Sequence, residues 1–219
     1  MDGAPDFGEI VRSILGDEEP ARPETDTDRR ILDATLTLLG EYGERRLTMD
    51  DVAEAAKVGR KTVFRRFGSK SNLLSRVYEG EVRKAIAEMR AAVEGSDEVG
   101  ERLTRAALAL MDFAVPHPVT ARLVRAEPQT LVALWTQGSP SGFETLRFAL
   151  AMLARGEDRT VPPVRLEQAC GVLARHLLSL QLIPPVDGKL PSKSPSARFV
   201  ERVAESLADP AVRRGDAAA

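Results

Sequence analysis

Two short helical segments separated by a turn of three or four residues constrain the fold more than any other feature of the sequence. Thr48, followed three residues later by Asp51, is typical of a helix start, because a Thr hydroxyl accepts a hydrogen bond from a free amide of the first turn. The second segment, Arg60–Phe67, carries Val63 and Phe67 at i, i+4 spacing, which predicts a buried face. This arrangement has the spacing of a helix-turn-helix.

Basic residues gather on the second segment and just beyond it. Residues 55–78 include seven basic residues and no acidic one, although the whole chain has a formal net charge of −2. The basic residues are Lys57, Arg60, Lys61, Arg65, Arg66, Lys70 and Arg76. An α-helix fits the major groove of DNA, where Arg and Lys reach the guanine O6 and N7 acceptors. We therefore predict that Arg60, Lys61, Phe64 and Arg65 face outward, toward DNA.

The rest of the chain also follows a helical period, and no stretch alternates with period two for long enough to predict a strand. Gly and Pro residues divide the pattern into segments. The predicted helices are 27–43, 48–56, 60–67, 68–93, 98–115, 119–127, 129–136, 141–155, 163–183 and 197–207. We predict an all-α fold with a flexible acidic N-terminal arm (1–26), a three-helix helix-turn-helix DNA-binding domain (27–72) and a C-terminal helical domain (73–219).

The motif has a specific family resemblance. The run from Leu47 to Lys70 resembles the DNA-binding signature of TetR-family transcriptional regulators, and the likeness extends over about residues 27–75. The matching residues are Thr48, Val52, Ala53, Ala56, Val58, Thr62, Phe67, Ser69, Lys70 and Leu73. The resemblance implies a dimeric repressor that binds double-stranded operator DNA and is released by a small molecule.

The resemblance also implies a role for individual residues. The first residues of the second segment would meet base edges and nearby phosphates. Phe64 holds the place of a family Tyr, so it keeps an apolar contact near a thymine methyl and lacks the hydroxyl bond to phosphate. Lys70 matches a phosphate-binding Lys at a helix N-terminus, and Thr48 is a second phosphate candidate besides its capping role. The predicted DNA-binding residues are Thr48, Arg60, Lys61, Thr62, Phe64, Arg65, Arg66 and Lys70.

Two residues of the turn depart from the family pattern. Lys57 stands where the family has a Gly that favours left-handed backbone, and a side chain there costs roughly 1 kcal/mol. Gly59 replaces a Ser helix cap, which costs only about a few tenths of a kcal/mol. These changes predict a slightly altered turn and leave the operator sequence open.

The C-terminal half is implied by the resemblance to hold an effector cavity and a dimer interface. Predicted helices 163–183 and 197–207 resemble the pair that forms the family's four-helix dimer bundle, although an intrachain core also accounts for some of their leucines. The small and apolar residues of this pair are Ala169, Gly171, Leu173, Ala174, Leu177, Leu180, Leu182, Phe199, Val200, Val203 and Leu207. Aromatic and Met side chains on interior helices suit an apolar ligand, and core packing is the alternative role for each. The predicted ligand-binding residues are Met111, Phe113, His117, Trp135, Phe143, Phe148 and Met152.

Enzymatic function is not predicted. The chain has two His and one Cys, and Cys170 and His176 lie six residues apart on one predicted helix, so their side chains do not converge. No metal-ligand spacing, P-loop or dinucleotide motif is present, so we expect no catalytic residues, metal or cofactor. The sequence predicts a cytoplasmic protein without a membrane span. A DNA-binding scaffold or activator that has no small-molecule effector remains the alternative.

Overall fold

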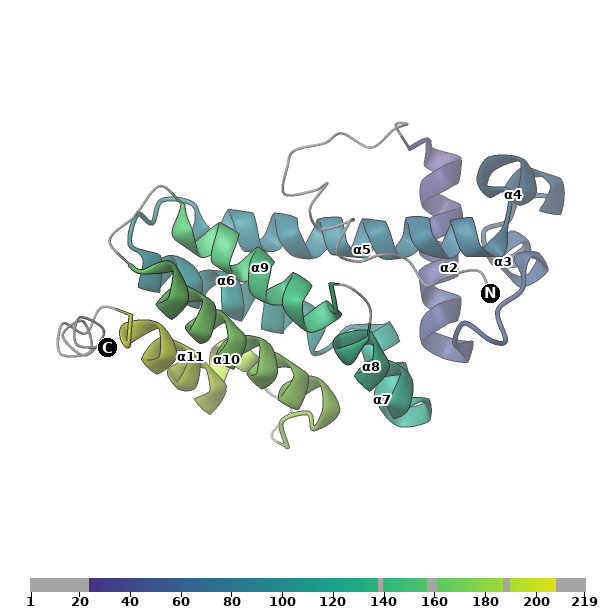
Figure 1. Ribbon diagram of the computed structural model, residues 1–219. Coiled ribbons are helices and arrows are strands. Elements are labelled where there is room, and N and C mark those ends of the chain that lie inside the picture. Colours follow the sequence, from purple (N-terminus) through teal and green to yellow (C-terminus); the bar gives the residue numbers. More distant parts are fainter. Residues whose placement is uncertain (1–23, 138–139, 157–160, 187–189, 208–219) are drawn as a thin grey trace. The chain divides into compact units, whose positions relative to one another are not determined.

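The computed structural model describes residues 24–137, 140–156, 161–186 and 190–207, and within these ranges the chain forms ten α-helices, one 3-10 turn and no strand (Figure 1). The all-α fold is therefore confirmed. The helices are α2 (Asp26–Tyr42), α3 (Met49–Ala55), α4 (Arg60–Phe67), α5 (Lys70–Val93), α6 (Val99–Ala114), α7 (Pro118–Ala126), α8 (Pro128–Thr136), α9 (Gly142–Arg155), α10 (Pro163–Leu182) and α11 (Pro195–Glu205).

These helices divide into two compact units, and α5 and α8 each contribute residues to both. Of the described residues, the first unit contains those up to Lys84 together with His117–Ala133, and the second contains Ala85–Pro116 and those from Leu134 onward. None of the helices in the described ranges combines the length and apolarity needed to cross a membrane.

The first unit is built around the helix-turn-helix. Figure 1 shows α2, α3 and α4 gathered around the N-terminal part of α5. Their apolar faces form one core, in which Ile31, Val52, Val63 and Leu73 have no exposed surface. α2 begins at a complete capping box between Thr25 and Asp28 and ends at Gly43, whose φ of 76° is readily adopted only by glycine.

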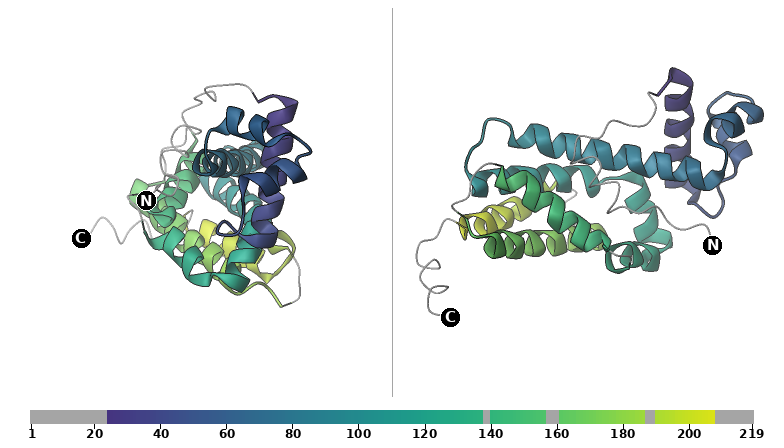
Figure 2. Two further views of the ribbon diagram at one scale, coloured as in Figure 1. Left: turned by 90° about the vertical axis from the view of Figure 1, so that its right-hand side faces the viewer. Right: turned by 45° about the horizontal axis from the view of Figure 1, so that its top comes forward.

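The second unit is a helical bundle. α6, α9, α10 and α11 lie side by side in the views of Figures 1 and 2. Leu103, Leu150, Leu166 and Leu173 are almost completely buried between them. A hydrogen bond of 3.0 Å from Trp135 Nε1 to the Gln181 side-chain oxygen joins the end of α8 to α10, and both residues are buried.

The predicted segments correspond closely to the observed helices. α4 has the predicted bounds, and the other helices differ from prediction by one or two residues at an end. The predicted loop 186–196 contains a 3-10 turn, Pro191–Lys193, that was not expected. Residues 1–23 of the predicted acidic arm lie outside the described residues, and at its C-terminal end Thr25 and Asp26 belong to the start of α2.

Candidate nucleic-acid interface

Helix α4 is anchored by one face and exposed by the other. Val63 has no exposed surface and Phe67 is buried, as their i, i+4 spacing predicted, and both belong to the core that contains α2, α3 and the start of α5. The opposite face of α4 exposes Arg60, Lys61, Phe64 and Arg65, which confirms the predicted outward orientation. One eight-residue helix therefore presents three cations and an aromatic ring to solvent.

The start of α3 is fixed by a capping box. The Thr48 hydroxyl accepts a hydrogen bond of 3.2 Å from the Asp51 amide and donates one of 2.6 Å to the Asp51 carboxylate. The same carboxylate accepts from the Thr48 amide at 3.0 Å. The predicted cap is thus confirmed, and a phosphate contact by Thr48 stays a prediction.

The turn between α3 and α4 is held from outside. Lys57 has φ 53°, the left-handed conformation expected at this position, and is the non-glycine residue with positive φ in the described part of the chain. The guanidinium of Arg30, on α2, donates to the carbonyl oxygens of Ala56 at 2.5 Å and of Lys57 at 3.2 Å. Those carbonyls follow the last turn of α3 and would otherwise depend on water. Arg30 therefore fixes the turn that sets the direction of α4. Because Arg30 and Ala56 are 26 residues apart in the sequence, the sequence did not reveal this role.

Arg60 is oriented by two neighbours. Its Nη1 donates to the Asp50 carboxylate of α3, and its guanidinium carbon lies 5.3 Å from the centre of the Phe64 ring. The Arg60 and Asp50 side chains are 62% and 58% exposed, so this arrangement sits at the surface. Arg60 is therefore both accessible to a ligand and restrained in orientation.

Arg66 points away from the exposed face and into the unit. Its Nη1 donates to the Asp28 carboxylate at 2.8 Å and to the Thr25 hydroxyl at 2.9 Å. The two charged side chains are only 19% and 10% exposed. Burial raises the pKa of Asp28, but hydrogen bonds from the Thr25 backbone and hydroxyl and from Arg66 outweigh it, so the net pKa lies below its ordinary value. This geometry favours a structural role for Arg66 over the predicted contact with DNA.

The N-terminus of α5 carries Lys70. Its Nζ donates to the Glu44 carbonyl oxygen at 2.6 Å, and the Ser69 hydroxyl accepts from the Asn72 amide at 3.1 Å, as a helix cap does. An ammonium has three donors, so Lys70 retains hydrogen-bonding capacity for a phosphate. Farther along α5, Arg76 pairs with Glu24 and Glu79 at 3.2 and 3.5 Å.

Acidic residues from outside the basic stretch therefore neutralise part of it. Asp50, Asp28 and Glu24 approach from other elements of the unit, and the sequence pattern alone did not predict them. Lys57, Lys61, Arg65 and Lys70 form no ion pair with another described residue, so they retain their positive charge on this unit.

The predicted ligand-binding residues differ in burial and are divided between the two units. Met111 and Trp135 are buried in the second unit, and Phe113 and Phe143 are partly buried there. Phe148 and Met152 are 45% and 51% exposed, so the expectation that they lie inside the domain is wrong, because the buried side of α9 is instead formed by residues such as Leu150 and Leu153. His117 belongs to the first unit.

His117 begins α7 and shares a hydrogen bond of 2.9 Å with the Glu81 carboxylate of α5. Its side chain is 14% exposed. This contact accounts for His117 as a link between two helices of the first unit, and a ligand contact by His117 stays a prediction.

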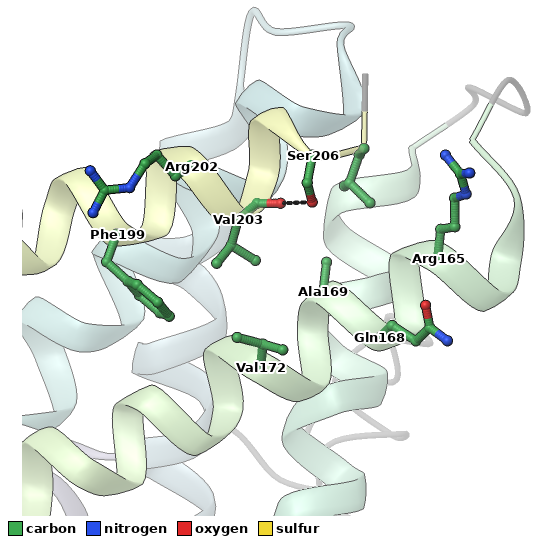
Figure 3. Close-up of a pocket in the computed structure, with 9 residues that line it drawn as sticks. Arg165, Gln168, Ala169, Val172, Phe199, Arg202, Val203 and Ser206 are labelled. Carbon is green, nitrogen blue, oxygen red and sulfur yellow. Dashed lines mark hydrogen bonds between the residues drawn. The ribbon is translucent and has the colours of Figure 1, made fainter. Parts of the chain in front are cut away.

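A groove of about 410 Å³ runs between α10 and α11 (Figure 3). Ala169, Val172, Phe199 and Val203 give it an apolar lining, and Arg165 and Arg202 lie beside them. The small residues and leucines expected in a dimer interface, such as Ala174 and Leu177, are instead buried within the chain. Ala169, Phe199 and Val203, which the sequence also favours for the dimer bundle, do line this groove.

Cys170 and His176 do not form a nucleophile–base pair. Burial raises the pKa of the Cys170 thiol to about 12, so it stays protonated at neutral pH. The His176 ring packs against Phe199 with ring centres 4.5 Å apart. Both residues are accounted for by packing around α10.

Comparison with known proteins connects this geometry to a family. Residues 31–77, which run from α2 through α4 into α5, match the family described as bacterial regulatory proteins, tetR family. The helix-turn-helix region of this chain is thus similar to that family's DNA-binding region. Over 98 residues it is 28% identical to the uncharacterized HTH-type transcriptional regulator YhgD of Bacillus subtilis (strain 168), a match that covers 45% of this chain and 51% of that protein. The chain thus matches about half the length of this curated relative.

Solved structures of bacterial regulators share the fold over most of their length. The TetR family repressor AlkX from Dietzia sp. strain DQ12-45-1b aligns with a TM-score of 0.54 and 22% identity, over 83% of this chain and 95% of AlkX. The fatty acid degradation regulator FadR from Bacillus halodurans aligns with a TM-score of 0.55 and 15% identity, over 86% of this chain and 98% of FadR. At these identities the likeness concerns the fold.

Proposed function

We propose that this protein is a dimeric transcriptional repressor that binds operator DNA through α4 and leaves it when a small apolar molecule binds the second unit. The observation that carries the proposal is the division of α4 into a buried face, with Val63 and Phe67, and an exposed face, with Arg60, Lys61 and Arg65. Such a helix can enter the major groove and read base edges while its apolar side holds it in place.

We propose a dimer because one recognition helix contacts too few base pairs to identify an operator. A two-fold dimer reads two half-sites about 34–36 Å apart. The groove between α10 and α11, with Val172 and Val203 on its two sides, is the apolar surface that we assign to the partner protomer. An exposed apolar groove of this kind suits a self-complementary interface.

The effector is proposed to be an apolar, chain-like molecule. Among the structural relatives, AlkX is implicated in biodegradation of n-alkanes and FadR is a fatty acid degradation regulator. Of the predicted ligand-binding residues, Met111 and Trp135 are buried in the second unit, and we propose that these two contact the effector. A ligand that prefers a conformation with a different spacing of the two α4 helices would lower the affinity for DNA.

One experiment tests DNA binding and effector release in sequence. Purified protein selects duplexes from a random pool, and the salt dependence of its affinity for the selected duplex is compared with that of Lys70→Ala. Loss of a phosphate contact would weaken binding to all duplexes and lower the slope of log affinity against log salt by about 0.9. Failure to enrich any duplex would refute the proposal.

The release step is tested with the same complex. Lauric acid, palmitic acid and an n-alkane are titrated into it while anisotropy of the labelled duplex is followed. Trp135 is the one tryptophan of the chain, so its fluorescence reports binding to the second unit independently. Release that accompanies a fluorescence change supports the mechanism, whereas binding with no change in DNA affinity contradicts it.

A further inference from the structure

Asp50 lies beside the exposed face of α4 although it belongs to α3. Its carboxylate accepts a hydrogen bond from Nη1 of Arg60, and the Phe64 ring lies 5.3 Å from the Arg60 guanidinium carbon. The guanidinium is thus held between an anion from one helix and an aromatic ring from its own helix. Neither the charge pattern nor the family resemblance pointed to Asp50.

This ion pair has little to do with the stability of the fold. Its side chains are 62% and 58% exposed, and exposed pairs of this kind contribute little because water and salt screen them. An acidic residue on a surface suited to DNA also repels phosphate. Asp50 also lies in the first turn of α3, where a carboxylate interacts favourably with the helix dipole, so it is the pairing with Arg60 that calls for a reason other than folding.

The hydrogen-bonding geometry of Arg60 supplies that reason. A guanidinium has five N–H donors in a fixed planar fork. The bond from Nη1 to Asp50 leaves the Nε–Nη2 edge available, and two parallel donors are what the O6 and N7 atoms of guanine accept. Asp50 and Phe64 fix the plane in which that edge lies, so Arg60 meets a base in one orientation.

From this geometry we infer that Asp50 is a specificity-determining positioning residue, which orients Arg60 for a guanine and penalises binding to DNA where no guanine is placed to receive it. The inference rests on the proposed binding of duplex DNA through α4. On a matching site, the oriented Arg60 forms its bidentate contact and offsets the repulsion between Asp50 and phosphate. On a random site, the repulsion remains.

The test compares Asp50→Asn with the matched control Glu54→Gln. Glu54 is exposed one turn farther along α3, so the control removes one negative charge from the same helix without touching Arg60. Affinities are measured for the selected duplex, for variants with each G·C pair replaced, and for random duplex. A bidentate Arg–guanine contact discriminates by roughly 5- to 150-fold, so Asp50→Asn is expected to lower the ratio of specific to random affinity by about fivefold or more.

A double-mutant cycle then separates positioning from a simple charge effect. In an Arg60→Ala background, Asp50→Asn should produce no further change in the affinity ratio, because the residue through which it acts is gone. Asp50→Glu keeps the charge but moves the carboxylate by one methylene, and it should shift or weaken discrimination at the same base pair. Circular dichroism confirms that each variant is folded.

The outcomes distinguish this inference from the proposed function. If the wild-type protein selects no duplex, the proposed function fails. If it selects one and Asp50→Asn changes the affinity ratio no more than Glu54→Gln does, the positioning role of Asp50 is refuted while DNA binding stands. A loss of discrimination that persists in the Arg60→Ala background also overturns the inference.

Discussion

Replacing Arg66 with Met tests whether the second half of α4 holds the domain together or contacts DNA. Met keeps most of the apolar stem but removes the charge and the bonds of 2.8 and 2.9 Å to Asp28 and Thr25. With side chains 19% and 10% exposed, the pair lies between a surface ion pair, at about 0.2–1 kcal/mol, and a fully buried one, at about 3–5 kcal/mol when one partner is removed. Hydrogen bonds to charged groups contribute about 1.5–3 kcal/mol. We expect Arg66→Met to lower the unfolding free energy by about 2 kcal/mol.

The pH dependence of stability provides an independent readout of the same pair. The pKa of Asp28 is lower in the folded protein than its ordinary value, so its contribution is fully present above about pH 4 and is lost as the pH falls through the folded-state value. Urea denaturation followed by circular dichroism at several pH values should therefore show an acid-dependent loss of stability that is smaller in Arg66→Met and in Asp28→Asn.

DNA binding by the same variant decides between the two roles. A residue that contacts phosphate contributes about 0.9 to the slope of log affinity against log salt. We expect Arg66→Met to leave that slope unchanged and Lys61→Met, which removes an exposed charge from the same helix, to lower it by about 0.9. A stability change below about 0.5 kcal/mol together with a lower slope for Arg66→Met would refute the structural role.

Three further changes test local features of the two units. Lys57→Gly should stabilise the protein by up to about 1 kcal/mol because φ is 53° there, whereas Lys61→Gly, inside α4, should destabilise it by a similar amount; urea denaturation measures both. Gly142→Ala should cost about 1–3 kcal/mol, because the added Cβ would lie 2.5 Å from the Leu134 carbonyl oxygen, and an unchanged melting temperature would contradict this. Trp135→Phe should cost about 1–3 kcal/mol by leaving the Gln181 side chain unsatisfied, which the thermal transition followed by circular dichroism checks, with recovery in a Gln181→Leu background.

The helix-turn-helix was predictable because its signals are local. The bond between Thr48 and Asp51 joins residues three apart, and the buried pair of Val63 and Phe67 lies one turn apart on α4. Contacts between residues three or four apart can be predicted from the spacing of residue types along the chain. The positive φ of Lys57 was implied by the family resemblance, because Lys57 stands where the family has a Gly.

The partners of the cations were not predictable, because they come from distant parts of the chain. Arg66 binds Asp28, which lies 38 residues away, and Arg30 binds carbonyls 26 and 27 residues away. Only the packing of α2 against the helix-turn-helix brings these groups together. The error at Phe148 and Met152 had another origin. Their burial was inferred from their apolar side chains, but burial on a helix depends on which side a residue occupies, and both lie on the side of α9 opposite the buried Leu150 and Leu153.

The clamp that Arg30 places on the carbonyls of Ala56 and Lys57 has a consequence for sequence variation. Because Arg30, on α2, holds the turn between α3 and α4, position 57 does not require glycine, the residue best suited to a positive φ, and the turn tolerates a Lys there. Tolerance at that position is then conditional on Arg30: a chain that lost the arginine would regain its geometry most readily by a second change, from Lys57 to glycine. The two sites should therefore be epistatic, with Arg30→Ala more harmful beside Lys57 than beside a glycine.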